Sequence, residues 1–186
     1  MIRAFVAIPM PDRVRDRLDD LAHELDEGRA PAWETFHLTL AFLGELSGGA
    51  LEDVAWELDR LRAEAPQVAL KGLGVFGGAR PRSAHAVARP EPRLSALREA
   101  VRRAARAGGL ELPRERFTPH VTVARFSARA PAGAGLARWL EREKAFETAP
   151  FAPREAVLYR SWRGAQGAAH EPLMDVPLSA EIAPSG

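Results

Sequence analysis

Two histidines of this chain are each followed, two positions later, by a threonine within an otherwise apolar segment. His37 and Thr39 alternate with leucines, and His120 and Thr122 alternate with valines. Because side chains alternate across a β-strand, each histidine shares one face with its threonine. Two imidazoles with ordinary pKa values of about 6.5 can be held one neutral and one protonated, so that one takes a proton while the other gives one. Since a threonine hydroxyl can donate to a phosphate oxygen, the two motifs predict paired acid and base chemistry on a phosphate group.

A structural role and a metal site are the alternatives to paired catalysis for these histidines. A single histidine on a strand is most often a partly buried, hydrogen-bonded residue without a chemical role, and this applies to His37 or His120 taken alone. Matched contexts for two of only five histidines favour chemistry for the pair. For a metal site, two histidines without nearby carboxylates or cysteines form a poor ligand set. We therefore expect neither a metal nor another cofactor.

The elements that must position these residues follow from hydrophobic periodicity and from the glycines and prolines that interrupt it. Strands are predicted over residues 3–8, 36–43, 68–76, 83–89, 120–126, 155–162 and 171–178, and helices over 11–27, 51–61, 92–106 and from 136 onward. Each half of the chain thus runs strand, helix, strand, helix, strand. Both histidines fall near the start of the middle strand of their half.

Matching landmarks in the two halves predict an internal duplication. Prolines at positions 9 and 11 lie at the start of the first predicted helix, and prolines at 90 and 92 lie at the start of the third, 81 residues later. The two histidine motifs are 83 residues apart. Nearly equal spacing of landmarks is typical of a repeat. We therefore predict one bilobal domain over residues 1–186, with approximate halves 1–78 and 79–186. If the lobes pack about a pseudo-twofold axis, both histidines look into one cleft.

The composition limits which partners are plausible. The 186 residues are 46% hydrophobic and 27% charged, an ordinary globular mixture with a net charge of +1. This balance excludes a broad electrostatic coat for nucleic acid, so a phosphate site must be local. The absence of cysteine excludes disulfides, thiolate nucleophiles and cysteine zinc sites, and it favours an intracellular location. No apolar run reaches the roughly 18 residues of a membrane span, and the N-terminus lacks a signal-peptide layout, so we expect a cytoplasmic protein.

The histidine motifs resemble those of a known family. Residues 37–44 (HLTLAFLG) and 118–125 (TPHVTVAR) look like the two signature motifs of the two-histidine phosphoesterase superfamily. Within it the chain is most similar to the LigT-like RNA 2′,3′-cyclic phosphodiesterases, once called 2′-5′ RNA ligases. Residues 3–8 resemble the opening strand of that group, and residues 157–161 resemble its late strand. The resemblance therefore covers almost the whole chain.

The resemblance implies a fold and a reaction. The expected fold is α+β and bilobal, with antiparallel sheets facing a central cleft and helices on the outside. The expected reaction is metal-independent opening of an RNA 2′,3′-cyclic phosphate end to a 2′-phosphate by a monomer. By motif position, His37 would protonate the departing 3′ oxygen, His120 would activate water, and Thr39 and Thr122 would bind the phosphate. The alternatives are 2′-5′ joining of RNA ends and a nucleotide-binding module without turnover.

Phe42 and Arg125 each follow their motif histidine by five residues and so occupy equivalent positions with opposite chemistry. Strict alternation would turn both away from the histidines, unless the strand bends there. For Phe42 the alternatives are core packing and stacking on a base. For Arg125 we expect a cation that faces the phosphate, because burial without a partner would be unfavourable.

The remaining basic residues and histidines are less specific. Arg80 and Arg82 lie in a loop after a predicted strand and could contact RNA, with a solvated turn as the alternative. His85 and His170 stand where the family often carries aromatic residues, so the base contacts stay open and neither is given a role. The arginines of the helix at 92–106 are expected to face solvent, with a nucleic-acid patch as the alternative.

Overall fold

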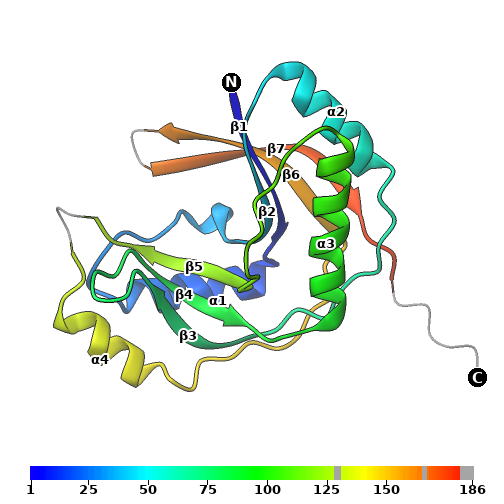
Figure 1. The fold of residues 1–186 in the computed structure, drawn as a ribbon. Coiled ribbons are helices and arrows are strands. Elements are labelled where there is room, and N and C mark those ends of the chain that lie inside the picture. The colour runs from blue at the N-terminus through cyan, green and yellow to red at the C-terminus, as the bar shows by residue number, and fades with distance from the viewer. Residues whose placement is uncertain (128–130, 165–166, 181–186) are drawn as a thin grey trace, which may run out of the picture.

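The computed structural model describes residues 1–127, 131–164 and 167–180 as an α+β fold built on one antiparallel sheet (Figure 1). In chain order the elements are β1 (Ile2–Pro9), α1 (Asp12–His23), the 3₁₀ helix η1 (Trp33–Thr35), β2 (His37–Leu46), α2 (Gly48–Asp59), β3 (Leu70–Phe76), β4 (Ser83–Ala88), α3 (Pro92–Ala107), β5 (His120–Arg125), α4 (Ala134–Arg142), β6 (Glu155–Gly164) and β7 (Gly167–Pro177). The predicted fold class is confirmed, and each predicted strand and helix is present with shifted ends.

The sheet consists of two groups of strands that meet at one seam. Its strand order is β3-β4-β5-β2-β1-β6-β7, and every neighbouring pair is antiparallel. At the seam β2 meets β5 through the pair Leu38–Val121. From there the strands β3 to β5 and the strands β1, β2, β6 and β7 diverge (Figure 1). The strand order reads symmetrically about the seam, β3-β4-β5 against β6-β1-β2.

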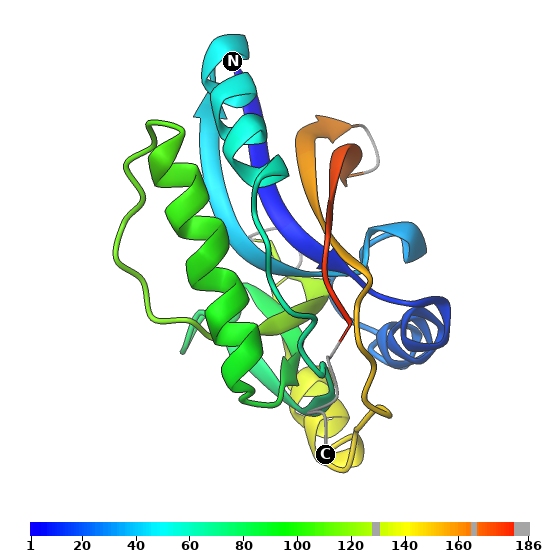
Figure 2. The same cartoon turned by 90° about the vertical axis from the view of Figure 1, so that its right-hand side faces the viewer.

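The helices lie outside the sheet and are also related across the seam. The helix α3 follows β4 along the chain but packs against β2 and α2, whereas α1 follows β1 but packs against β5. Figure 2 shows α2 and α3 together on one flank and α1 on another. Thus β3 joins the strands of the second half, β6 joins those of the first half, and α1 and α3 each pack against a strand of the other half. This arrangement is what a duplicated chain with intertwined halves would produce. The division into halves 1–78 and 79–186 stays a prediction.

The core is formed by the sheet face that these helices cover. In β1 all residues from Ala4 to Ile8 are buried, and Ala4, Val6 and Ile8 belong to the same core cluster as Leu94 and Leu97 of α3. The helix buries one face with a period near 3.6, whereas the central strand β1 is buried on both faces. The opposite face of β2 and β5 is left for polar residues.

The first helix is shorter than predicted because Glu27 caps a different helix. It ends at His23, and the Glu27 carboxylate accepts hydrogen bonds from the backbone N–H groups of Gly133 (2.6 Å), Gly135 (2.8 Å) and Leu136 (3.3 Å). These are the free N–H groups at the start of α4, where a negative charge is favourable. The same hydrogen bonds, with that of Gly133 the largest contribution, lower the pKa of Glu27.

Two arginines of α3 are buried, so the expectation of a fully solvated basic face is wrong. Arg98 is 7% exposed and Arg102 is 4% exposed. Arg98 donates to the carbonyl of Glu115 and lies over the Phe117 ring at 4.8 Å, and Arg102 donates to the carbonyl of Pro113. Both therefore hold the segment that leads into β5 against α3.

No helix in the described part of the chain is long and apolar enough to cross a membrane.

Candidate active site

The seam brings the two histidine motifs together on one face of the sheet. Leu38 and Val121 pair across it, and both side chains are fully buried on the helix-covered side. The residues before and after each of them must therefore point to the opposite side. These are the histidine and the threonine of each motif, all four of them half-buried. We call this side of β2 and β5 the histidine face.

Both motif histidines are oriented by the same local hydrogen bond. Nδ1 of His37 lies 2.6 Å from the carbonyl oxygen of Thr35, and Nδ1 of His120 lies 2.7 Å from that of Thr118. A carbonyl oxygen only accepts, so each Nδ1 must carry the hydrogen. In the neutral ring Nε2 is then left with a lone pair, and in the protonated ring Nε2 has a proton to give. Each histidine is thus prepared to exchange a proton through Nε2.

Burial shifts both histidines toward the neutral form. It lowers the pKa of His37 to about 4; the Thr35 carbonyl acts in the opposite direction, and nearby His170, Arg125 and His120 lower it further. Burial likewise lowers the pKa of His120, with Arg125 as a further cause. The influence of His120 on His37 shows that the two rings are electrostatic neighbours. In the free protein burial therefore favours the neutral form of both rings at pH 7.

Matched β-bulges turn the next side chains toward the histidines. Between Thr39 and Ala41, β2 contains one more residue than its partner β1, and β5 contains an extra residue at the equivalent place, Val123, relative to β4. A bulge of this kind reverses the alternation of the residues beyond it. Phe42 and Arg125 therefore lie on the exposed side of their strands.

The bulges correct the expectation from strict alternation. Phe42 is 60% exposed, so core packing is wrong for this residue. Its ring centroid lies 6.2 Å from that of Phe5. Its position suits contact with a ligand on the histidine face.

An aromatic floor lies under His37, and sequence reasoning missed it. Phe5 is 3% exposed, and its ring lies 4.9 Å from His37, 5.1 Å from Tyr159 and 4.9 Å from His170 between centroids. The Tyr159 ring is nearly parallel to that of Phe5, with 17° between the planes. The signal was present, because Phe5 occupies the alternate phase to the small and aliphatic core residues of β1.

Each motif histidine is accompanied by a second histidine. The His170 ring stands edge-on to His37 at 5.3 Å, and the His85 ring lies 5.0 Å from His120 at an angle of 61°. His85 is 3% exposed and stacks on Phe76 at 4.1 Å. Burial lowers the pKa of His170, and it lowers the pKa of His85 to about 4. Each motif histidine is therefore in ring contact with a second imidazole that is also held in the neutral form.

Arg125 supplies positive charge to the histidine face. Its positive charge lowers the pKa of His37, His120 and His170. Partial burial, and then the neighbouring Arg3, lower the pKa of Arg125 itself, but an arginine stays charged at neutral pH. No carboxylate in the described ranges forms an ion pair with it. Sequence reasoning missed Arg3, which belongs to the same cationic group.

Arg80 and Arg82 are not brought into contact with the histidines. Both lie in the loop between β3 and β4, at least partly exposed. The backbone of Arg82 bonds to Phe76 and Phe126, which fixes the loop beside the end of β5. Their side chains make no hydrogen bond or ion pair within the described residues, and an RNA contact at this rim stays a prediction. The described residues also contain no cluster of three or more potential metal ligands.

Comparisons with known proteins agree on one family. A family model described as the 2′-5′ RNA ligase superfamily matches residues 10–165. A protein of Aeropyrum pernix named RNA 2′,3′-cyclic phosphodiesterase is 32% identical over 118 residues, which cover 62% of this chain and 67% of that protein. A Geobacillus stearothermophilus protein of the same name is 30% identical over 165 residues, or 84% of this chain; the match spans about half (51%) of its length.

Solved structures show the same similarity. E. coli LigT complexed with 3′-AMP is 25% identical with a TM-score of 0.75, over 96% of this chain and 98% of that one. A protein of Thermus thermophilus, TT0787, is 26% identical with a TM-score of 0.76, over 96% and 99%.

Proposed function

The chain belongs to the 2′-5′ RNA ligase superfamily, and on this premise we propose that it opens 2′,3′-cyclic phosphate ends of RNA or oligonucleotides to 2′-phosphomonoesters. One observation carries the proposal. His37 and His120 lie on one face of the sheet, beside the seam, and each has its Nδ1 bonded to a carbonyl two residues earlier. Two equivalently prepared imidazoles are suited to one acid and one base acting on the same phosphate. We propose that they act without a metal.

In the proposed reaction both proton transfers pass through Nε2. His120 takes a proton from water as the water oxygen bonds to phosphorus. The bond between phosphorus and the 3′ oxygen breaks, and His37 gives its proton to that oxygen. The products are a 2′-phosphate and a 3′-hydroxyl, and the enzyme is left with its proton on the other histidine. The assignment of His37 as acid and His120 as base follows the motif positions.

The bound phosphate has to raise the pKa of the histidine that acts as the acid. Both histidines are neutral in the free protein at pH 7 because burial lowers the pKa of each. A phosphate anion between them raises both pKa values, since an opposite charge favours the protonated ring. One proton taken up with the substrate then gives the mixed state that the reaction needs. Thr39, Thr122 and Arg125 are proposed to hold the phosphate oxygens.

The nucleoside is proposed to lie over the aromatic side of the histidine face. Phe42 exposes a ring that can stack on a base, with Phe5 beneath it. Arg80 and Arg82 are proposed to contact the RNA backbone at the rim. These contacts would position the ribose, while the histidines perform the chemistry.

The test is to incubate the protein with a 2′,3′-cyclic-phosphate oligonucleotide in EDTA and to map the end group. A 2′-phosphate end supports the proposal. A 3′-phosphate end, a requirement for added metal, or no turnover would contradict it. A 5′-hydroxyl oligonucleotide added in a second reaction tests joining, which would show as a longer product.

A further inference from the structure

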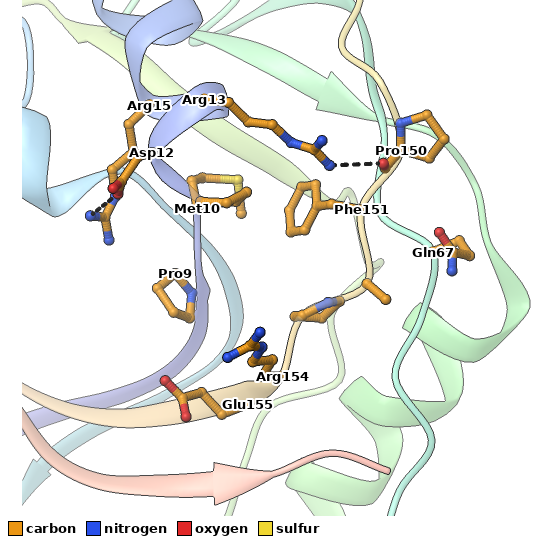
Figure 3. A pocket seen from close by; sticks show the side chains of 13 residues that line it. Pro9, Met10, Asp12, Arg13, Arg15, Gln67, Pro150, Phe151, Arg154 and Glu155 are labelled. Carbon is orange, nitrogen blue, oxygen red and sulfur yellow. Dashed lines mark hydrogen bonds and ion pairs between the residues drawn. The ribbon is translucent and has the colours of Figure 1, made fainter. Parts of the chain in front are cut away.

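A pocket of about 580 Å³ lies between the start of α1 and the segment that leads into β6 (Figure 3). We call it the α1 pocket. The motif histidines do not line it, and no part of the proposed reaction uses it. Its charged lining residues are Asp12, Arg13, Arg15, Arg154 and Glu155.

The α1 pocket begins next to the histidine face. Pro9 lines it and is the backbone partner of His37 in the ladder between β1 and β2. Arg15 also lines the pocket. Burial raises the pKa of Tyr159, and the positive charge of Arg15 acts in the opposite direction, so the two side chains interact electrostatically. The Tyr159 ring in turn lies 6.3 Å from the His37 ring between centroids.

The arginines of the α1 pocket have more donors than partners. Arg154 makes no side-chain hydrogen bond or ion pair within the described residues, and Arg13 donates to the carbonyl of Pro150 at 3.2 Å. Arg15 forms an ion pair with Asp12 at 3.4 Å and lies over the Trp33 ring, but its buried Nε has no acceptor among the described residues.

The charge of the pocket is positive despite its carboxylates. Arg13, Arg15 and Arg154 outnumber Asp12 and Glu155, and Glu155 forms no ion pair in the described part of the chain. Guanidinium groups with free donors in a concave site match the several oxygens of a phosphate. A phosphodiester with one negative charge is the ligand that balances this lining.

We propose that the α1 pocket is a second phosphate subsite that binds a backbone phosphate of the RNA whose cyclic end lies at the histidines. The inference rests on the proposed function and extends it. An RNA strand carries a phosphate at every nucleotide, so a strand that leaves His37 across the aromatic floor presents one to the pocket. A mononucleotide has no such phosphate. The protein is therefore specific for oligonucleotides over 2′,3′-cyclic mononucleotides.

The test measures the ratio of kcat/KM for a cyclic-phosphate tetranucleotide to that for 2′,3′-cyclic AMP. Arg154→Ala and Arg13→Ala should each lower this ratio by about tenfold, the usual effect of one charged hydrogen bond. Arg60→Ala is the matched control, because Arg60 is exposed at the end of α2 and has no side-chain partner in the described residues. An unchanged ratio in both pocket variants would overturn the inference.

A neutral backbone identifies the group that the pocket binds. A tetranucleotide with one methylphosphonate linkage has one backbone charge fewer, at a position that can be chosen. One of these tetranucleotides should lose about tenfold in the wild type and little more in Arg154→Ala, because the two changes remove the same contact. The inference is wrong if no methylphosphonate substitution changes kcat/KM. If inorganic phosphate then alters turnover of the mononucleotide in the wild type but not in Arg154→Ala, the pocket binds a separate anion instead.

Direct binding separates this inference from the proposed function. The dissociation constant of a 2′-phosphorylated tetranucleotide should rise about tenfold in Arg154→Ala and stay constant in Arg60→Ala. If the wild type turns over neither substrate, the proposed function fails, and this binding comparison still decides whether the pocket holds RNA. Equal dissociation constants for the wild type and Arg154→Ala would then overturn the subsite as well.

Discussion

Leu38 and Val121 form the backbone pair through which the two groups of strands meet, and both side chains are fully buried. Because they point into the core, the histidine and threonine next to each point to the other side. The separation of the two histidines is therefore set by a strand pairing and not by loops. Rigid placement of this kind is what paired acid and base chemistry requires.

The pH dependence of kcat/KM should show a bell with its maximum between about pH 4 and pH 6.5. In the proposed reaction the active free enzyme carries one proton on the pair, and burial lowers both pKa values, that of His37 to about 4. Activity falls at lower pH because the base becomes protonated, and it falls at higher pH because the acid loses its proton. The profile of kcat should lie at higher pH, since bound phosphate raises both pKa values. Rates on 2′,3′-cyclic AMP across this range check the prediction, and a monotonic profile would refute paired catalysis.

The free energy of unfolding should fall as pH drops from about 6.5 toward 4, in part because of His85. Its pKa in the folded protein is about 4, below the value of about 6.5 expected in the unfolded chain. The unfolded chain therefore binds more protons in this window, so acid favours unfolding, while above it the contribution is complete. His85→Phe should remove up to about 3 kcal/mol of this dependence. Urea unfolding at pH 7 and pH 4.5 measures this dependence, and His23→Gln, at an exposed histidine, is the control. An equal loss of the free energy of unfolding between these pH values in the wild type and in His85→Phe would contradict the prediction.

Arg125→Ala should raise KM and lower kcat together, because a cation at the phosphate binds the ground state and also stabilises charge that develops in the transition state. It should also move the pH profile upward, since Arg125 lowers the pKa of His37 and of His120. The melting temperature should change little, because the described residues give Arg125 no ion pair. A marked loss of thermal stability would show a structural role in place of phosphate binding.

Phe42→Ala should weaken substrate binding by the ~1–3 kcal/mol that is typical of one base on one aromatic ring. The side chain is 60% exposed, so the melting temperature should hold. Phe5→Ala is the contrasting variant, because Phe5 is 3% exposed and its loss should destabilise the fold by about 3–5 kcal/mol. Calorimetry and binding measured on both variants distinguish the two roles. A large drop in the melting temperature of Phe42→Ala would exclude a purely stacking role.

Much of this fold could be predicted from local patterns. The segment 3–8, which is apolar after its first residue, predicted β1, and the leucines of α3 predicted a helix with one buried face. The shared face of His37 and Thr39 also follows from alternation alone. These features depend only on residues that are close together in the sequence, so the local hydrophobic pattern is enough to predict them.

Other features depend on contacts that are distant in sequence. The bulges before Phe42 and Arg125 appear only when β2 and β5 are registered against β1 and β4. Glu27 left its helix because it caps α4 more than a hundred residues later. Arg98 is buried because the segment before β5 folds over it. Each of these positions is decided by tertiary contacts that override local preference.

Single and double substitution of the two histidines tests their joint action in one measurement, the turnover of a 2′,3′-cyclic-phosphate oligonucleotide. His37→Ala and His120→Ala should each lower kcat by about 10²–10⁴-fold, the usual contribution of a positioned acid or base. The double variant should be little slower than either single variant, because both groups act in one step. A single variant that keeps more than half of the wild-type rate would remove that histidine from the chemistry and contradict the proposed reaction.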